Sequence, residues 1–249
     1  MRVGVYIDGY NLYYAGRGWF GRGTSGWKWL SPRSLATALI AERQNWTGAH
    51  IHRVVYCSAR VDVKATPGAH RDQEVYFRAI RTSGGVDHIE LGFYVANSKN
   101  VALCRPSPTT GKPELIHPNG SITPSDLPIR ITTDRESGQQ IVIANALIRE
   151  EKGSDVNIAT HLLLDVLSGE IDAAVVISND SDLALPLRKA RERVPVGTVN
   201  PSRNQTAGAL RGRADDGVGR HWWRKLGEPD FTSHQMPDPV GRLTRPDGW

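Results

Sequence analysis

The sequence has little cysteine and no long apolar run, and each absence excludes a class of protein. Cys57 and Cys104 are the two cysteines among 249 residues. Two cysteines cannot build a disulfide framework or an all-cysteine zinc site, so we expect a reducing compartment. No apolar segment approaches the roughly 18 to 20 residues that a bilayer-spanning helix needs, so we expect no membrane association. Asp8 stands where a signal peptide would need apolar residues, which favours a cytoplasmic protein.

The charge is moderate in amount but unevenly distributed. The composition, 39% hydrophobic and 23% charged, is that of an ordinary globular protein, and the length suits one large α/β domain or a domain with extensions. The net charge is +5, and residues 1–60 hold eight basic against two acidic residues. Such a segment favours a polyanionic partner such as nucleic acid, although a solvated basic face would have the same composition.

Short apolar segments alternate with helical patterns along most of the chain. We expect strands at 2–8, 51–60, 87–96, 172–178 and 194–200, and helices at 31–43, 70–85, 154–167 and 183–193. Ser31 and Ser154 have the residue type that caps helices, and Pro32 suits a first helical position. This alternation predicts a doubly wound α/β sandwich with a central, mainly parallel sheet flanked by helices.

Two segments depart from the alternation. Residues 97–140 contain six prolines that break regular elements, so we expect an irregular insertion that can include short strands. It would serve as a lid, a partner site or a disordered loop. After residue 200 we expect a short helix near 205–210 and then a tail. We therefore divide the chain into a domain of residues 1–200 and a C-terminal extension, 201–249, that packs on the domain or trails from it.

Four aspartates fall at one predicted edge of the sheet. Asp8 ends the first strand, Asp180 and Asp182 follow the fourth, and Asp155 begins the helix that leads into it. Ligands bind at this edge in doubly wound sheets. Three of them also have a plainer explanation, because Asp8 suits a turn, Asp155 the favourable end of a helix dipole and Asp182 a helix cap. Clustered carboxylates repel unless a cation lies among them, which predicts Mg²⁺ or Mn²⁺ and phosphoryl chemistry.

Three motifs in this order resemble a known family. "VYIDGYNLYY", "EEKGSDVNIATHLLLD" and "AAVVISNDSDLALPLRKARE", followed by "VGTVNP", are similar to the NYN domain, a branch of the PIN-like nuclease superfamily, over residues 2 to 200. The resemblance implies a PIN-like sheet of strand order 3-2-1-4-5 and metal-dependent ribonuclease activity. Asn11 matches the family asparagine near the site, and Lys152 matches the basic residue ahead of the helix aspartate.

One position departs from the family pattern. Many NYN helices have a second aspartate where this chain has His161. His161 lies six residues beyond Asp155, about 9 Å along the helix and on another face. Its imidazole could bind metal, contact phosphate or move protons, or it could be a hydrogen-bonded structural histidine.

The resemblance implies a metal-activated water that cleaves an RNA phosphodiester and leaves a 5′-phosphate. Asp8 and Asp180 would be direct ligands, and Asp155 and Asp182 would complete the shell. Substrate-binding groups would be Asn11, Lys152 and Ser178, together with Arg17, Arg22 and Lys28 from the Trp-rich segment 16–30. Tryptophans beside cations can stack bases of single strands, although these could instead pack on the domain. "RHWWRK" at 220–225 has the same chemistry more weakly, and docking on the domain is the favoured interpretation.

We therefore expect a metal-dependent endoribonuclease of RNA processing or of a toxin or defence system. Its partners would be single-stranded or structured RNA, with a second copy or a regulatory protein possible in addition. The alternative is a non-catalytic RNA-binding or scaffold protein that retains the fold, which His161 allows. A haloacid-dehalogenase-type phosphatase is disfavoured, because "DGYN" lacks the D-x-D that such enzymes have after the first strand.

Overall fold

A computed structural model describes residues 1–63, 66–116 and 129–249. The chain divides into two compact units. Unit 1 comprises Met1–Tyr94 and Glu151–Trp249, and unit 2 comprises Val95–Glu150.

Unit 1 alternates strands and helices. Its elements are β1 (Arg2–Asp8), α1 (Gly9–Phe20), α2 (Pro32–Ala41), β2 (His50–Ala59), α3 (Pro67–Thr82), the first part of β3 (His88–Ala102), the end of β7 (Gln140–Lys152), α4 (Ser154–Leu167), β8 (Ala173–Ile177), the 3-10 turn η1 (Ser181–Leu183), α5 (Ala184–Arg191), β9 (Val196–Asn200), α6 (Gly208–Arg211), β10 (Trp222–Lys225) and α7 (Glu228–Thr232).

The central strands form a parallel sheet, as the sequence predicts. β1 pairs in parallel with β2 and β8, β2 pairs with β3, and β8 pairs with β9. In the described residues β10 extends this sheet beyond β9, and β7 and β6 (Ile129–Thr133) follow β3, so the order is β10-β9-β8-β1-β2-β3-β7-β6. The predicted mixed α/β class with a mainly parallel central sheet is confirmed. The sheet is wider than the five strands expected.

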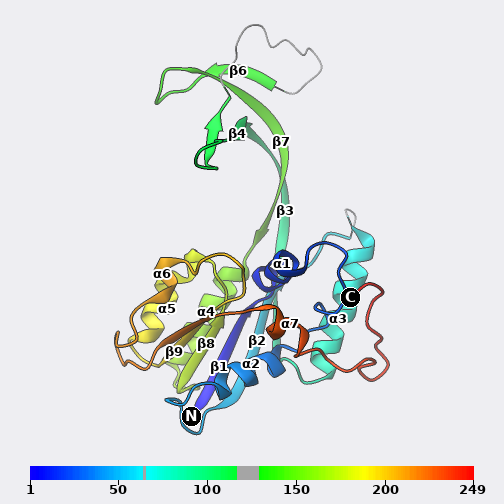
Figure 1. Ribbon diagram of the computed structural model, residues 1–249, viewed down its shortest axis with the longest axis vertical. Helices are drawn as coiled ribbons and strands as arrows, with labels where there is room; N and C mark the ends of the chain where they lie inside the picture. The colour runs from blue at the N-terminus through cyan, green and yellow to red at the C-terminus, as the bar shows by residue number, and fades with distance from the viewer. Residues whose placement is uncertain (64–65, 117–128) are drawn as a thin grey trace. The chain divides into compact units, whose positions relative to one another are not determined.

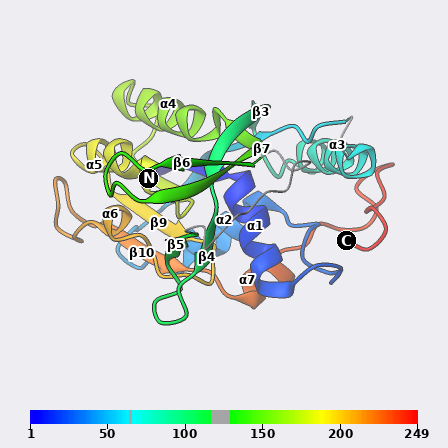
Figure 2. The ribbon, with the colours of Figure 1, turned by 90° about the horizontal axis from the view of Figure 1, so that it is seen from above.

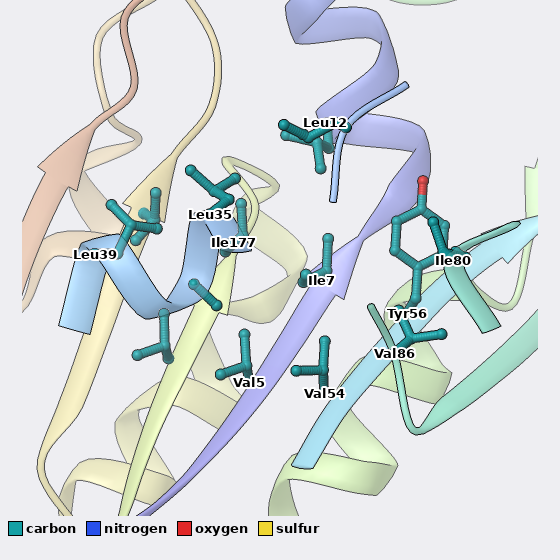
Figure 3. Packing of buried hydrophobic residues seen from close by; sticks show 14 of the residues in the cluster. Val5, Ile7, Leu12, Leu35, Leu39, Val54, Tyr56, Ile80, Val86 and Ile177 are labelled. Atoms are coloured by element: carbon teal, nitrogen blue, oxygen red, sulfur yellow. The ribbon is translucent and has the colours of Figure 1, made fainter. Parts of the chain in front are cut away.

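Helices cover both faces of the sheet in unit 1. α4 and α5 lie on one face, and α1, α2 and α7 lie on the other (Figures 1 and 2). On the α2 face, Val5, Ile7, Val54 and Ile177 from the sheet pack with residues such as Leu35 in an apolar core (Figure 3). A smaller core on the α4 face contains Val55, Cys57, Ile158 and Leu162. Because strand residues alternate between the two faces, the strands β1, β2, β8 and β9 each contribute to both cores.

Local signals place both α2 and α4, which occupies the predicted residues 154–167, but they name the wrong cap for α4. α2 begins at Pro32, and the Ser31 hydroxyl oxygen accepts a hydrogen bond from the backbone N–H of Ser34 at 3.3 Å, so the predicted cap is confirmed. The predicted cap at Ser154 is wrong. Ser154 is the first residue of α4, and Gly153 precedes it at φ +103°, a left-handed conformation in which a side chain is strained.

Two segments expected to be loop or tail are regular elements. α1 occupies Gly9–Phe20, and Trp222–Lys225 of "RHWWRK" form β10, which pairs in parallel with β9. The expected helix near 205–210 is present as α6. Residues 201–249 belong to unit 1.

Unit 2 consists of strands where the proline content predicts an irregular insertion. The ends of β3 and β7 continue into it, β6 pairs antiparallel with β7, and β4 (Cys104–Pro106) pairs antiparallel with β5 (Pro113–Leu115). Pro106 and Pro113 face each other at the end of the β4–β5 ladder, where prolines are tolerated. Pro118, Pro124 and Pro128 lie outside the described residues.

None of the helices in the described ranges combines the length and apolar character needed to cross a membrane.

Candidate active site

Asp8 is a buried carboxylate at the junction of β1 and α1. Its side chain is 3% exposed and accepts two hydrogen bonds, from the backbone N–H of Asn11 at 2.8 Å and from the Ser178 hydroxyl at 2.9 Å. Asp8 thereby caps α1. Gly9 follows it with no Cβ, and a Cβ there would lie 2.4 Å from the Tyr56 ring. The sequence "YIDGYN" therefore lets a buried strand end directly in a helix that starts on a carboxylate.

Ser178 links Asp8 to the second pair of aspartates. Its hydroxyl oxygen accepts a hydrogen bond from the Asp180 N–H at 3.1 Å while its proton goes to Asp8. Asp180 Oδ1 in turn accepts the Asp182 N–H at 3.1 Å and caps the turn η1. Asp180 is half-buried, whereas Asp182 is exposed. The Asp180 carboxylate is therefore held by the backbone of its own turn.

Asp155 lies in the first turn of α4, beside Glu151. Glu151 Oε1 accepts two hydrogen bonds from Ser154, one from the hydroxyl at 2.8 Å and one from the backbone N–H at 3.2 Å. The Glu151 carboxylate therefore binds the start of the helix. Asp155 is half-buried. Its position suits the favourable end of the helix dipole, as the plainer of the two explanations expects.

The four aspartates form one electrostatically coupled group, which we call the acidic edge. Burial is the main cause that raises the pKa of Asp8 to about 7. The hydrogen bonds from Asn11 and Ser178 lower this pKa, and the negative charges of Asp155 and Asp180 raise it further. Burial, followed by the charges of Asp180, Glu151 and Asp182, raises the pKa of Asp155 to about 6. Carboxylates from three segments therefore meet at the predicted edge, and two of them change protonation near neutral pH.

The acidic edge does not have the compactness of a metal centre. Within the described ranges, the group of metal-ligating side chains whose ligand atoms all lie within 4.8 Å of one another is His88, Glu90 and His161. Oxygens that bind one Mg²⁺ or Mn²⁺ at about 2.0 to 2.2 Å lie about 3 Å from their neighbours around the ion. The carboxylates of Asp8 and Asp180 are held by hydrogen bonds from backbone N–H groups, those of Asn11 and Asp182.

The predicted polar neighbours have structural partners. The side-chain amide oxygen of Asn11 accepts a hydrogen bond from the backbone N–H of Asn179 at 3.2 Å and so connects α1 to the loop after β8. The Ser178 hydroxyl is engaged by Asp8 and Asp180, as described above. Lys152 ends β7 next to Gly153 and is exposed.

The Trp-rich segment is part of the core. Trp27 and Trp29 are 3% and 0% exposed, so their predicted role in stacking bases is wrong, and the alternative that they pack on the domain is confirmed. Lys28 donates a hydrogen bond to the Gly248 carbonyl at 3.1 Å, and the Arg17 guanidinium lies 5.7 Å from the Tyr14 ring. Arg22 is exposed in the loop after α1. RNA, a second copy and a regulatory protein as partners stay predictions.

A tyrosine cluster lies next to the acidic edge and was not predicted from the sequence. Tyr10 and Tyr14 lie one turn apart on α1 with ring centroids 4.5 Å apart, and Tyr94 of β3 lies 6.3 Å from Tyr10. Burial, then Tyr14, and then the charge of Glu151 raise the pKa of Tyr10 to about 12. Because Glu151 acts on both Tyr10 and Asp155, the tyrosines and the acidic edge adjoin. The i, i+4 spacing in "YNLYY" would have been the signal if the helix had been predicted.

A buried polar network under α4 was also not predicted from the sequence. The Tyr6 hydroxyl donates to Asp165 at 2.7 Å, and Arg53 donates to the other Asp165 oxygen at 2.8 Å. Cys57, opposite both Asp8 and Glu90 in the strand register, is buried, and burial followed by the Asp8 charge raises the pKa of its thiol to about 12. The thiol is therefore neutral and unreactive at physiological pH.

Comparison with known proteins yields one informative relative. No family model matches the chain. The chain is 28% identical over 269 aligned residues to the 6-hydroxy-3-succinoylpyridine 3-monooxygenase HspA of Pseudomonas putida, and the match covers 100% of this chain and 75% of that protein. A solved structure of a protein of unknown function from Vibrio parahaemolyticus superposes with a TM-score of 0.45 and 13% identity, covering 92% of this chain and 94% of that one.

The match to a monooxygenase corrects the functional predictions. An NYN-type, metal-dependent endoribonuclease with Mg²⁺ or Mn²⁺ is wrong, as is the non-catalytic RNA-binding alternative, because the named relative is an oxidoreductase. The physical reason is that a doubly wound sheet brings the residues after its strands to one edge whatever the reaction. Aspartates at that edge therefore indicate a site without specifying its chemistry.

Proposed function

We propose that this chain is an oxidoreductase that inserts one atom of O₂ into a small aromatic substrate. The observation that carries the proposal is the extent of the match to the monooxygenase, which spans the whole chain and so includes every segment of the acidic edge. We further propose that the acidic edge and the tyrosine cluster together form its substrate site.

The tyrosine cluster supports an aromatic substrate. The name of the relative specifies a hydroxylated pyridine ring with a succinoyl group, which ends in a carboxylate. A planar ring of this kind is suited to stacking on Tyr10 and Tyr14, which are partly exposed beside the acidic edge. Arg17, on the same helix and next to Tyr14, is suited to pairing with the substrate carboxylate.

Asp155 supports proton transfer at the ring hydroxyl. With a pKa of about 6 it is largely ionised at neutral pH, and it can still take up a proton. Accepting the proton of the ring hydroxyl makes the ring more electron-rich and so more readily oxygenated. The overall reaction consumes substrate, O₂, two electrons and two protons, and it yields hydroxylated substrate and one water.

The two electrons need a donor, for which we propose a reduced nicotinamide as a soluble co-substrate. The chain does contain the spacing G-x-G-x-x-G, at Gly16, Gly18 and Gly21, but there it ends α1 instead of joining a strand to the start of a helix. A Cβ at Gly16 would lie 2.5 Å from Trp27, so this glycine serves helix packing. The turn that does follow β1 holds the Asp8 carboxylate, which disfavours a pyrophosphate. The described residues therefore do not fit a resident dinucleotide, including one that contains a flavin.

Oxygen insertion is tested with isotopically labelled O₂. Purified protein is incubated with 6-hydroxy-3-succinoylpyridine and NADH, with and without added flavin, and the product is analysed by mass spectrometry. We expect substrate-dependent NADH oxidation and one labelled oxygen atom in the product. An unlabelled product, or none under either condition, would refute the proposal.

Replacement of Asp155 tests the proposed site. Asp155→Asn is expected to lower kcat by about 100-fold or more, the usual contribution of a positioned base. In the wild type the activity should rise as the pH increases through about 6, because Asp155 must be ionised to accept the proton. The control is Asp134→Asn, a half-buried aspartate of unit 2 whose carboxylate accepts hydrogen bonds from Ser137, and it should leave both kcat and the pH profile unchanged. Equal activity of the Asp155 variant and this control would remove Asp155 from the site.

A further inference from the structure

His88, Glu90 and His161 converge on the α4 face of unit 1 and are separate from the residues of the acidic edge. Glu90 Oε2 lies 2.8 Å from His88 Nε2 and 3.4 Å from His161 Nε2. The two imidazole rings have centroids 5.0 Å apart and are tilted by 55°. All three side chains are half-buried, so the cluster has both protein walls and access to solvent.

The fold holds the three side chains from two elements. His88 and Glu90 are two residues apart on β3, so both point to the same face of the sheet. The strand register places them opposite Val55 and Cys57, whose side chains belong to the core under α4. His161 comes from the middle of α4, which packs on that face. A rigid strand and a well-packed helix therefore fix the donor atoms.

We infer that His88, Glu90 and His161 form a binding site for one divalent transition-metal ion. Ligands bound at about 2.0 to 2.2 Å, at angles of about 90 to 109°, lie about 2.8 to 3.6 Å apart, and the separations of Glu90 Oε2 from the two imidazole nitrogens fall in that interval. Two imidazoles and one carboxylate are the ligand set of three-ligand zinc sites and of ferrous oxygenase sites. Partial exposure leaves the remaining coordination positions to water.

The chemistry of the cluster favours a transition metal over an alkaline-earth ion. Imidazole suits iron and zinc, whereas Mg²⁺ and Ca²⁺ prefer all-oxygen sites. Two imidazole nitrogens approach one carboxylate oxygen, and a single cation can replace the hydrogen bonds that hold them there. The inference is independent of the proposed function, although a ferrous ion at this site would be compatible with an oxygen-consuming enzyme.

The inferred metal site lies close to the acidic edge. Asp8, Cys57 and Glu90 are register partners across three adjacent strands, β1, β2 and β3. Because neighbouring strands are about 4.8 Å apart, Glu90 lies about 10 Å from Asp8 on the same face of the sheet. The inferred metal site is therefore a neighbour of the acidic edge and shares none of its residues.

Metal binding is tested on the full, untagged chain after removal of metal with a chelator. Isothermal titration with Zn²⁺, with Mg²⁺, and with Fe²⁺ under anaerobic conditions measures stoichiometry and affinity. The absorption spectrum of added Co²⁺ reports imidazole coordination. We expect one Zn²⁺ or Fe²⁺ per chain and at least about 100-fold weaker binding of Mg²⁺.

Variants assign the ion to its ligands. His88→Ala, Glu90→Gln and His161→Ala should each weaken Zn²⁺ binding by about 100-fold or more, since loss of an outer-shell partner alone costs 10 to 100-fold. The matched control is His52→Ala, which removes a histidine of similar exposure whose Nε2 lies 3.8 Å from Glu170. Circular dichroism shows whether each variant is folded, and the Co²⁺ spectrum of the wild type provides a second readout.

Two outcomes overturn the inference. One is the absence of stoichiometric Zn²⁺ and Fe²⁺ binding to the wild type, which would leave a hydrogen-bonded surface triad. The other is binding that survives all three substitutions or is lost in Asp8→Asn and Asp180→Asn. Neither outcome depends on oxygenase activity, and failure of the labelling experiment would leave the metal titration unaffected.

Discussion

The two faces of the sheet in unit 1 are built on different principles. On the α2 face, apolar and aromatic side chains form a large core that includes Trp27, Trp29 and Tyr76. On the α4 face, a smaller apolar core is interrupted by buried polar groups. They include Asp8, the Tyr6–Asp165–Arg53 network and the contact between Arg191 and Thr198 at 2.9 Å.

The difference separates stability from chemistry. Apolar burial stabilises a fold without constraining what is bound, whereas a buried polar group costs free energy unless it is paired. The polar face also holds both candidate sites, the acidic edge and the His88–Glu90–His161 cluster. We therefore expect substitutions on the α2 face to change mainly stability, and those on the α4 face to change stability in a pH-dependent way.

The largest effect is expected on the apolar face. Trp29→Ala should lower the free energy of unfolding by about 3 to 5 kcal/mol, because it opens a cavity in the core. It also removes the hydrogen bond from the indole N–H to the Pro237 carbonyl at 3.0 Å. Urea denaturation measures the change. The matched control is Trp223→Ala, whose indole is 50% exposed and lies against Arg211, and which should cost less than about 1 kcal/mol. Similar costs for the two substitutions would contradict the burial of segment 16–30.

An intermediate effect is expected from the polar network under α4. Arg53→Met leaves the buried Asp165 with the Tyr6 hydroxyl as its remaining partner, which should cost about 2 to 3 kcal/mol. Lys189→Met breaks an exposed pair with Glu192 and should cost less than about 1 kcal/mol. Thermal unfolding of both variants measures the contrast. Equal losses would mean that the α4 face gains no more from its ion pairs than the surface does.

The smallest effect is expected from the pH dependence of Asp8. Its pKa is raised from 3.8 to about 7, so between about pH 4 and pH 7 the folded protein keeps a proton that the unfolded chain releases. The free energy of unfolding therefore decreases as the pH increases through this window, and the loss is complete above about pH 7. Asp8→Asn removes this dependence and should gain about 1 to 3 kcal/mol relative to the wild type between pH 5 and pH 8.

The control for Asp8 has the opposite sign. Arg2 lowers the pKa of Asp172 to about 2, mainly through their hydrogen bond, so the stability that this pair contributes is lost as the pH falls toward that value. Asp172→Asn should therefore destabilise the protein at neutral pH, with an effect that shrinks in acid. Urea denaturation of both variants, from acidic to neutral pH, measures how the free energy of unfolding of each depends on pH. Parallel pH profiles for the two would refute the raised pKa of Asp8.

Much of the framework can be predicted from local patterns. The strands at 2–8, 173–177 and 196–200 have apolar sequences that suit burial on both faces, and α2 has both its cap and its proline. The gathering of Asp8, Asp155, Asp180 and Asp182 follows from the same alternation, because parallel strands end at one edge. The positions of these elements depend on neighbouring residues, so local sequence patterns predict them. Their arrangement in the sheet then follows from the general right-handedness of crossovers.

Other features depend on contacts between distant segments. The segment "GRGWFGRGTSGWKWL" has the composition of a nucleic-acid-binding loop, yet Trp27 and Trp29 are buried in the core. Phe20 of the same segment lies 6.0 Å from Phe231 of α7. The six prolines of 97–140 suggest irregular structure, yet most described residues there belong to strands. Composition does not report which surface is covered by a distant part of the chain.

The sequence by itself determined the α/β alternation, the parallel central sheet and the edge at which the aspartates gather, because hydrophobic period and turn residues act locally. Only the tertiary structure decided that Asp8 is buried and hydrogen-bonded, that His88 and Glu90 meet His161, and that Trp27 and Trp29 lie inside. Register between strands and the packing of α4 on β3 bring those groups together. Neither is encoded within any single segment of the chain.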